Sequence, residues 1–348
     1  MAARITIDPE AVARNWQSLA SRVAPAQCAA VVKADAYGLG IMVVVPALWR
    51  AGCRTFFVAL EAEAHTLRAT LPDATIYVLN GVFDDPRTAI EAQLLPVVSS
   101  VDALAEWPPD APFALNVDTG MNRLGVTPQE ALKLGAAGLT PELLTSHFAC
   151  ADTPSHPLND VQEATFEEVR RAFARTRASL ANSAAVLTRP TAHLNLVRPG
   201  IALYGAVAAS GTAALEPAVR VEARVIQVRS AAAGDPVGYG AAEHVTRPTR
   251  LAIASIGYAD GYLRAAGGAD GVSSAPVCVN GRMTRLVGRV SMDLLAIDVT
   301  ELPCRRGDWV ELFGPSVPVD AVANAAGTIG YELLTGLSRR AERRIAPL

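Results

Sequence analysis

Short apolar runs alternate with longer segments of helical composition through roughly the first 200 residues of this 348-residue chain. A continuous apolar run bounded by turn residues is typical of a strand buried on both faces of a parallel sheet. Eight such strand–helix units match the size of a (β/α)8 barrel, so we predict a TIM-type barrel, with a doubly wound open sheet as the alternative. The predicted strands are residues 31–33, 56–60, 76–80, 94–98, 113–118, 143–148, 184–187 and 197–204, and the predicted helices include 61–70, 127–137 and 161–180.

The pattern changes near Leu215. Apolar and charged residues alternate over 219–225, which is typical of an antiparallel strand with one buried face. Asn280-Gly281 between two apolar runs is a strong signal for a β-hairpin. We therefore predict an α/β chain of two domains: an N-terminal barrel over 8–215 and a mostly β C-terminal domain over 216–348, to which residues 1–7 add a strand.

Charge and cysteine usage argue against several classes of protein. The net charge is -3, and no basic cluster interleaved with aromatic residues marks a nucleic-acid interface. The five cysteines are widely spaced and form no CxxC motif, so neither a disulfide framework nor a metal site is expected. The longest apolar run, 41–49, is too short to span a bilayer, and the N-terminus lacks the apolar core of a secretory signal. We expect a cytoplasmic protein without a membrane or nucleic-acid partner.

A lysine stands at the end of the first predicted strand, in the stretch AAVVKADAYGLG (29–40). An unpaired ammonium is costly to bury, so Lys33 needs a chemical reason to be there. One reason is that the amine forms an imine with a carbonyl cofactor, which is how pyridoxal phosphate is held. The alternative is a lysine whose stem is buried and whose amine reaches a surface ion pair.

Other polar residues also follow predicted strands, and in this fold the carboxyl ends of the strands form the active face. Each has an ordinary interpretation as well: Arg123 as a surface ion pair, His147 as a core histidine and Ser183 as a helix cap. We expect Ser183 just before the seventh strand, and Arg198 with Gly200 and Ile201 on the eighth. The expected cluster comprises Lys33, Tyr37, Asn116, Asp118, Arg123, His147, Asp152, Ser183 and Arg198.

The chain resembles the alanine racemase family, the pyridoxal-phosphate enzymes built from a barrel and a β domain. AVVKADAYGLG (30–40) is similar to that family's cofactor-lysine signature. Further blocks match in order along nearly the whole chain: NVDTGMNRLGV (116–126), SHFACAD (146–152), ANSAA (181–185), LNLVRPGIALYG (194–205), VGYG (237–240), IGYADGY (256–262), LVGRVSMD (286–293) and IGYELLTGLS (329–338).

The resemblance implies interconversion of L- and D-alanine by two acid/base groups. Lys33 would form the internal aldimine with pyridoxal 5′-phosphate and serve the D-substrate face, while Tyr239 serves the L-substrate face. Arg123 and the backbone of Met292 would hold the substrate carboxylate. Racemisation removes a proton from one face of a carbon and returns one to the other, and each positioned acid/base group contributes roughly 10²–10⁴ in rate.

The resemblance also implies binding roles. Arg198 would meet the pyridine nitrogen, with His147 beside the ring and linked to Arg198, through which positive charge would assist Tyr239. The cofactor phosphate would be bound by Tyr37, Ser183, Gly200, Ile201 and Tyr331. The entrance would be narrowed by Tyr258 and Tyr331, with Asp152 and Arg289 further out. Family members are homodimers with shared active sites, so Tyr239, Tyr258 and Met292 would act with Lys33 of the other subunit.

The sequence departs from the family pattern at Asn116, where many members carry a carbamylated lysine that orients the substrate arginine. We hypothesise that a small anion such as chloride takes that place beside Arg123, because a buried guanidinium without a counter-charge is costly. Leu39, Asp35 and Cys150 also differ from common residues. These changes leave open a racemase of serine or another small amino acid.

Two other functions are weighed against racemisation. A decarboxylase or aldolase of the same fold would place an acid at the pyridine nitrogen, where this sequence has Arg198. A non-enzymatic carrier of pyridoxal phosphate would be a lone barrel, whereas this chain continues into a β domain with Tyr239 and Met292.

Overall fold

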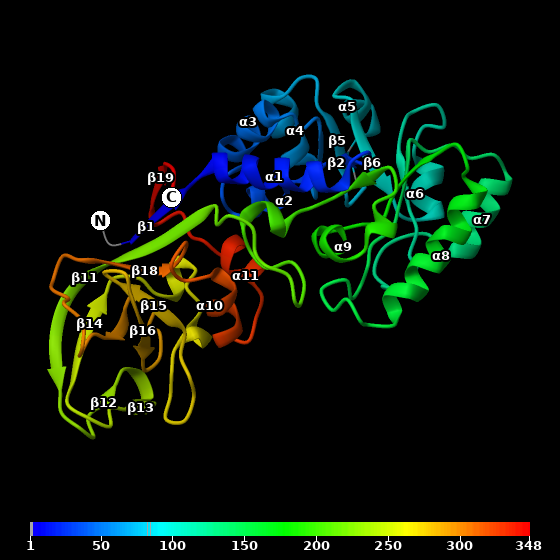
Figure 1. Cartoon of the computed structure of the whole chain (residues 1–348). Helices are drawn as coiled ribbons and strands as arrows, with labels where there is room; N and C mark the ends of the chain where they lie inside the picture. The colour runs from blue at the N-terminus through cyan, green and yellow to red at the C-terminus, as the bar shows by residue number, and fades with distance from the viewer. Residues whose placement is uncertain (1–2, 82, 84) are drawn as a thin grey trace. The chain divides into compact units, whose positions relative to one another are not determined.

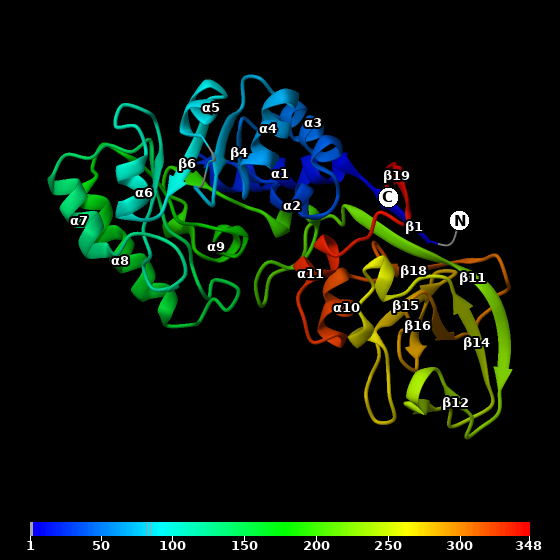
Figure 2. The same ribbon diagram turned by 180° about the vertical axis from the view of Figure 1, so that it is seen from behind.

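The computed structural model describes residues 3–81, 83 and 85–348. The chain folds into two compact units: Val12–Leu215, and a second unit that combines the start of the chain up to Ala11 with Glu216–Leu348. We call them the barrel unit and the β unit (Figures 1 and 2). No helix among the described residues is both long and apolar enough to cross a membrane.

Parallel strands form a closed sheet in the barrel unit. Strands β3 to β9 pair in chain order, each with the next. Strand β10 closes the sheet: it pairs with β2 at one edge, and the N–H groups of Asn195 and Arg198 donate to Ala178 and Ala181 at the other. This arrangement confirms the predicted barrel. The strands are β2 (Gln27–Cys28), β3 (Ala30–Val31), β4 (Thr55–Val58), β5 (Thr75–Val78), β6 (Leu94–Val98), β7 (Ala114–Asn116), β8 (Leu143–Thr145), β9 (Arg177–Ser179) and β10 (Leu196–Val197).

Helical segments follow the barrel strands. Helix α7 begins with a capping box, in which Thr127 Oγ1 accepts the N–H of Glu130 at 3.2 Å and Glu130 Oε2 accepts the N–H of Thr127 at 2.8 Å. The helices are α1 (Pro9–Val23), which begins in the β unit, α2 (Lys33–Tyr37), α3 (Ile41–Ala51), α4 (Glu61–Thr70), α5 (Pro86–Glu91), α6 (Val101–Glu106), α7 (Pro128–Ala136), α8 (Leu158–Ala172), α9 (Ser183–Thr188), η1 (Pro190–Ala192) and η2 (Ile201–Tyr204).

The prediction of the seventh strand was wrong. Residues 184–187 lie in helix α9, whose N-cap Asn182 accepts the N–H of Ala185 at 3.1 Å. The seventh strand is β9, inside the segment 161–180 that was predicted as one helix. The reason is that a four-residue apolar run suits a buried helix as well as a strand. Ser183 therefore follows the seventh strand and does not precede it.

The eighth strand is also shorter than predicted. It ends at Val197, and Ile201 opens the 3-10 helix η2 (Ile201–Tyr204), so Gly200 and Ile201 lie beyond the strand. The apolar character of 201–204 reflects burial of this helix in the barrel unit, where all four residues are buried.

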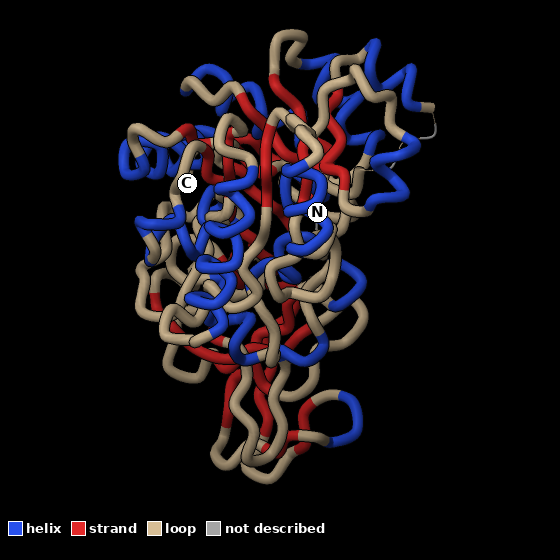
Figure 3. Tube along the Cα trace, turned by 90° about the vertical axis from the view of Figure 1, so that its right-hand side faces the viewer, coloured by secondary structure: helices blue, strands red, loops and turns tan. Residues whose placement is uncertain are grey.

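Antiparallel strands dominate the β unit, as predicted. Strands β11, β14, β17, β16, β15 and β18 pair in a closed ring, because the long strand β11 pairs with β18 in its first half and β14 in its second. Strand β1 pairs with β11, which confirms the N-terminal strand, and Asn280-Gly281 joins β15 to β16 with positive φ at both residues. Figure 3 colours the strands red.

The elements of the β unit are as follows. The strands are β1 (Ala3–Ile7), β11 (Val219–Ala231), β12 (Pro236–Val237), β13 (Glu243–His244), β14 (Thr249–Ala254), β15 (Pro276–Val279), β16 (Arg282–Val287), β17 (Leu295–Asp298), β18 (Trp309–Phe313) and β19 (Glu342–Ile345). The helices are η3 (Tyr239–Ala241), η4 (Tyr258–Asp260), η5 (Arg264–Ala266), α10 (Val319–Ala325) and α11 (Gly330–Thr335).

Candidate active site

The chain after Lys33 makes a left-handed helical turn. Ala34, Asp35, Ala36 and Tyr37 all have φ of 53–54°, and Gly38 continues in the left-handed region at 82°. Such a turn costs L-residues about 1–2 kcal/mol each, so the surrounding contacts must hold it. One contact is the stacking of Tyr37 on Tyr204, with ring centroids 4.7 Å apart. The turn thereby fixes the direction in which the chain leaves Lys33.

The surroundings of the Lys33 amine lower its pKa. Burial lowers its pKa, the positive charge of Arg123 lowers it further, and Glu63 acts in the opposite direction. A lysine with a lowered pKa has more of the free amine at neutral pH and is the stronger nucleophile. This environment favours the imine chemistry predicted for Lys33 over a surface ion pair.

Arg123 sits on a loop that one carboxylate organises. Asp118, just beyond strand β7, accepts the backbone N–H groups of Gly120, Met121, Asn122 and Arg123 at 2.9–3.1 Å. Partial burial would raise the Asp118 pKa, but these four hydrogen bonds outweigh it and lower the pKa. The hydrogen bonds to Asp118 fix the backbone of Arg123. The Arg123 side chain is exposed, and its guanidinium remains available to a ligand.

Arg198 is a buried cation held by neutral acceptors. Its Nη1 donates to the carbonyl of Ser179 at 2.9 Å and to the Ser179 hydroxyl at 2.5 Å, and its Nη2 donates to the carbonyl of Ser146 at 2.6 Å. Among the described residues no carboxylate forms an ion pair with it. Burial lowers its pKa to about 10, so it stays protonated at neutral pH. Within the described part of the chain, the Arg198 charge is therefore buried in the barrel unit and has no acidic partner.

His147 lies beside Arg198 and is neutral. Its Nδ1 lies 3.4 Å from Arg198 Nη2, and because arginine can only donate, Nδ1 acts as the acceptor. Burial, followed by the charges of Arg198, Arg123 and Lys33, lowers the His147 pKa to about 3. Of the predicted site residues, Lys33, Arg123 and Arg198 therefore lie near enough to His147 for their charges to act on it.

Ser183 and Gly200 shape a second group of donors. The Ser183 hydroxyl oxygen accepts the N–H of Gly200 at 2.8 Å and of Ala202 at 3.3 Å, which leaves its own O–H to donate. A Cβ on Gly200 would lie 2.3 Å from the Tyr37 hydroxyl, so only glycine fits. This hydroxyl and the N–H of Ile201 at the start of η2 suit an anionic group such as a phosphate.

The β unit carries Tyr239, Tyr258, Arg289, Met292 and Tyr331. The N–H of Tyr258 donates to Ser291 and that of Ala259 donates to Met292, both at 3.1 Å, and a Cβ on Gly257 would strike the Met292 carbonyl at 2.3 Å. Tyr239 is 71% exposed, and Gly240 after it lies against the Arg289 guanidinium. Tyr331 is on α11. The β unit thus presents Tyr239, Tyr258 and Met292 as exposed side chains.

Comparisons with known proteins agree with this geometry. Residues 7–208 match the family model "Alanine racemase, N-terminal domain", and residues 218–345 match "Alanine racemase, C-terminal domain". The chain belongs to the alanine racemase family. The biosynthetic alanine racemase of Agrobacterium fabrum is 47% identical over 98% of this chain and 93% of that protein.

Solved structures of alanine racemases resemble the fold closely. The biosynthetic alanine racemase of Pseudomonas aeruginosa aligns with a TM-score of 0.92 and 41% identity, over 99% of each chain. The alanine racemase of Bartonella henselae, described with covalently bound pyridoxal phosphate, aligns with a TM-score of 0.90 and 38% identity, over 99% of this chain and 100% of that one.

In this member of the alanine racemase family, Asn116 is engaged by its neighbours. Its Nδ2 donates to the carbonyl of Leu124 at 2.7 Å, and its Oδ1 accepts from the Thr145 hydroxyl at 3.1 Å. The side chain therefore braces the loop that carries Arg123 and supplies no negative charge to it. Asp152 lies beyond β8 with an exposed side chain, and its backbone carbonyl accepts the N–H of Ser210 at 2.7 Å.

Several residues that support this alanine racemase site were missed from the sequence. Ser146 and Ser179 hold Arg198, and Gln162 on α8 donates to the carbonyl of His147 at 2.9 Å. Glu63 acts on the Lys33 amine and accepts the N–H of Ala59 at 2.8 Å. Gln162 had a signal, because a polar residue on the buried face of an amphipathic helix needs a partner. The sequence offered no such signal for Ser179, because strand β9 lies inside a segment that was predicted as one helix.

The low pKa of His147 predicts a pH-dependent stability. Between its folded pKa of about 3 and its unfolded value near 6.5, the unfolded chain binds a proton here that the folded chain does not, so stability falls as the pH falls. Lowering the pH from about 6.5 to about 4.5 should cost roughly 2–3 kcal/mol through this group. Urea unfolding of His147→Gln should show a correspondingly weaker pH dependence than wild type, and the exposed His65→Gln should not. An undiminished dependence in His147→Gln would contradict the assignment.

Proposed function

We propose that this chain interconverts L- and D-alanine by two-base proton transfer, with pyridoxal 5′-phosphate as cofactor. The observation that carries the proposal is the Lys33 amine, with its lowered pKa, beside Arg123 and near the neutral His147 at the carboxyl ends of the barrel strands. Relatives named alanine racemase match nearly the full chain, which supports alanine as the substrate.

The residues present fit the cofactor. Pyridoxal phosphate has an aldehyde, a phosphate and a pyridine nitrogen; when bound, it withdraws electrons from the substrate α-carbon and so makes the α-proton more acidic. Lys33 supplies the amine, and Arg198, with His147 beside it, supplies a donor for the pyridine nitrogen. The Ser183 hydroxyl and the N–H of Ile201 suit the phosphate, and we assign Tyr37, Gly200 and Tyr331 to the same end.

Two side chains carry the proton transfer. The Lys33 Nζ exchanges a proton with the α-carbon on the D face, and the Tyr239 hydroxyl does so on the L face. Arg123 and the N–H of Met292 bind the substrate carboxylate and so orient the α-carbon between these two groups. Because His147 is neutral, the positive charge stays on Arg198. The imidazole, polarised by Arg198, then assists proton loss from the Tyr239 hydroxyl without carrying a charge of its own.

Arg198 limits the reaction to racemisation. A guanidinium cannot accept a proton from the pyridine nitrogen or give one up at neutral pH, so it leaves the ring uncharged. An uncharged ring withdraws electrons less strongly, which disfavours transamination and decarboxylation. This point supports racemisation over the decarboxylase and aldolase alternatives.

The site is completed in a homodimer. The barrel domain (8–215) supplies Lys33, and the β domain of the partner, residues 216–348 with the N-terminal strand, supplies Tyr239, Tyr258 and Met292. The exposure of these three side chains supports this assignment, because a proton-transfer group must be shielded from water in the working enzyme. Tyr258, Tyr331, Asp152 and Arg289 then line the entrance. The wide spacing of the cysteines supports action in the cytoplasm.

A small anion beside Arg123 replaces the missing carbamylated lysine. Asn116 is neutral and already hydrogen-bonded, so Arg123 lacks a counter-charge from this position. Removing chloride by exchange into a non-coordinating salt at constant ionic strength should raise the KM for alanine several-fold, consistent with at most about 1 kcal/mol for an exposed charge pair. Adding chloride back should restore it, and kinetics independent of halide would contradict this assignment.

The reaction itself is tested with the purified holoenzyme in D2O. L-alanine and D-alanine should each be converted to the other with deuterium incorporated at the α-carbon, and L-serine should be processed more slowly. Absence of racemisation, or formation of pyruvate or ethylamine in its place, would overturn the proposal. If the enzyme racemises serine faster than alanine, the alternative assignment as a serine racemase replaces the one proposed.

A further inference from the structure

The loop that carries Tyr239 contains a buried carboxylate. We call residues 236–245 the Tyr239 loop; it comprises β12, η3 and β13, with Val237 paired to Glu243. Glu243 is buried, in contrast to the exposed Tyr239 on the same loop. A buried carboxylate is expensive unless its oxygens are bonded, so its partners indicate its purpose.

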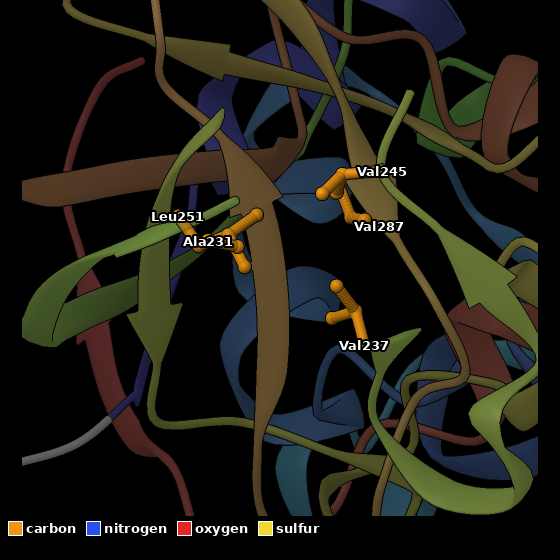
Figure 4. Close-up of a cluster of buried hydrophobic side chains, with 5 residues drawn as sticks. All are labelled: Ala231, Val237, Val245, Leu251 and Val287. Atoms are coloured by element: carbon orange, nitrogen blue, oxygen red, sulfur yellow. The ribbon is translucent and has the colours of Figure 1, made fainter. Parts of the chain in front are cut away.

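Apolar contacts anchor both ends of the Tyr239 loop. Val237 precedes the phenol and Val245 follows it, and both belong to a buried cluster with Ala231, Leu251 and Val287 (Figure 4). Next to this cluster, Val237 and Gly238 border a cavity of about 330 Å³ that Arg289 and Ser291 also line. This cavity is open to solvent, so on this side polar links supplement the apolar anchors of the loop.

Glu243 provides the most buried of those links. Its Oε1 accepts from Arg285 Nη1 at 2.5 Å, and its Oε2 accepts the N–H of Gly288 at 2.6 Å. A Cβ on Gly268 would lie 2.6 Å from the same Oε2, so a side chain at this position would displace the carboxylate. The carboxylate therefore joins the Tyr239 loop to the end of strand β16.

The segment that Glu243 holds leads directly into the substrate-binding backbone. Gly288 is followed within four residues by Arg289, Ser291 and Met292. One carboxylate thus links the loop of the Tyr239 phenol to the chain that carries the Met292 N–H. A shift of about 1 Å in such a pair can reduce a rate by about 10²-fold.

We propose that Glu243 is a positioning residue for proton transfer on the L face, which holds the Tyr239 loop in register with the Met292 backbone. The inference rests on the proposed function, because it assigns Tyr239 to the L face. Glu243 touches no reacting atom; it acts through Gly288 and Arg285.

The test is Glu243→Gln in the holoenzyme. Glutamine has nearly the same volume as glutamate, but an NH2 group replaces one of the two carboxylate oxygens. Because Arg285 and the Gly288 N–H are both donors, one of these two hydrogen bonds is lost. We expect α-proton exchange of L-alanine in D2O to slow by about 10–100-fold, while exchange of D-alanine, which starts at Lys33, falls by less than about 3-fold. A merely structural role would slow both exchanges equally.

Glu311→Gln is the matched control. Glu311 is also a buried carboxylate of the β unit; it accepts the N–H of Ser316 at 2.6 Å and of Val317 at 3.0 Å and pairs with Arg220. It lies on β18 and makes none of these contacts with the Tyr239 loop. Its substitution should lower the melting temperature without changing the ratio of L- to D-alanine exchange.

Gly268→Ala displaces the same carboxylate with its charge intact. Its added Cβ collides with Glu243 Oε2, and the expected loss of L-alanine exchange matches that of Glu243→Gln. Equal loss of both exchanges in the two variants, or the same ratio change in Glu311→Gln, would overturn the positioning role. If wild-type enzyme lacks racemisation, the proposed function fails instead, and the two failures are distinguished by that measurement.

Discussion

Replacing Lys33 with alanine is expected to reduce racemisation of alanine by about 10⁴-fold, because one side chain both binds the cofactor covalently and carries a proton on the D face. Burial and the charge of Arg123 lower the pKa of this amine, whereas the only other lysine of the chain, Lys133, is exposed on α7. Racemisation of both enantiomers, followed by circular dichroism, measures the loss. Lys33→Arg should lose activity to a similar extent, since a guanidinium remains protonated and is not a nucleophile.

The chain offers an unusually clean control for this prediction. It contains only two lysines, Lys33 and the exposed Lys133 on α7. Treatment of the holoenzyme with borohydride should attach the cofactor to a peptide that contains residue 33, and Lys133→Ala should retain full attachment and activity. Attachment at Lys133, or trapping that persists in Lys33→Ala, would contradict the assignment of the cofactor amine.

The barrel could be predicted because its strands are short, apolar and regularly spaced, but the same brevity caused the errors. The run at 184–187 is as apolar as a strand and became helix α9, while Arg177–Ser179 has one charged and one polar residue and became strand β9. Strand β9 forms because its three residues are held by the parallel neighbours of the closed sheet, and not by their own composition. The sheet then has no place for residues 184–187, which form a helix beyond it. The β unit was easier, since alternation over 219–225 and Asn280-Gly281 are local signals.

The sequence indicated where the titratable residues of the candidate site lie along the chain, but not which residues hold them. Lys33, Arg123, His147 and Arg198 each follow a strand, so the fold alone brings their side chains to one face. The partners that determine their behaviour come from contacts distant in sequence: Arg198 is held by Ser146, 52 residues away. No local pattern marks a serine carbonyl as the acceptor for a buried guanidinium. The neutral state of His147 likewise depends on burial and three cations, which only the folded barrel assembles.

Replacing Tyr239 with phenylalanine is expected to abolish racemisation while leaving one half of the chemistry intact. The variant loses only a hydroxyl from a 71% exposed side chain, so the stability of the β unit should change little. Without the phenol, no group serves the L face, and α-proton exchange of L-alanine should fall by about 10²–10⁴-fold. D-alanine should continue to exchange its α-proton with D2O through Lys33 and be recovered as deuterated D-alanine. Proton NMR of each enantiomer measures the two rates separately.

Tyr262→Phe is the matched control, because it removes a hydroxyl from the same unit. The Tyr262 hydroxyl is buried and has no hydrogen-bond partner among the described residues, so its loss should leave both exchange rates unchanged. If Tyr239→Phe slows D- and L-alanine exchange equally, the phenol does not act on one face alone, and a single base at Lys33 would have to serve both. If instead L-alanine exchange survives unchanged, another group carries the L-face proton and the two-base arrangement is wrong. Only the asymmetric outcome is consistent with an amine and a phenol on opposite faces of the same carbon.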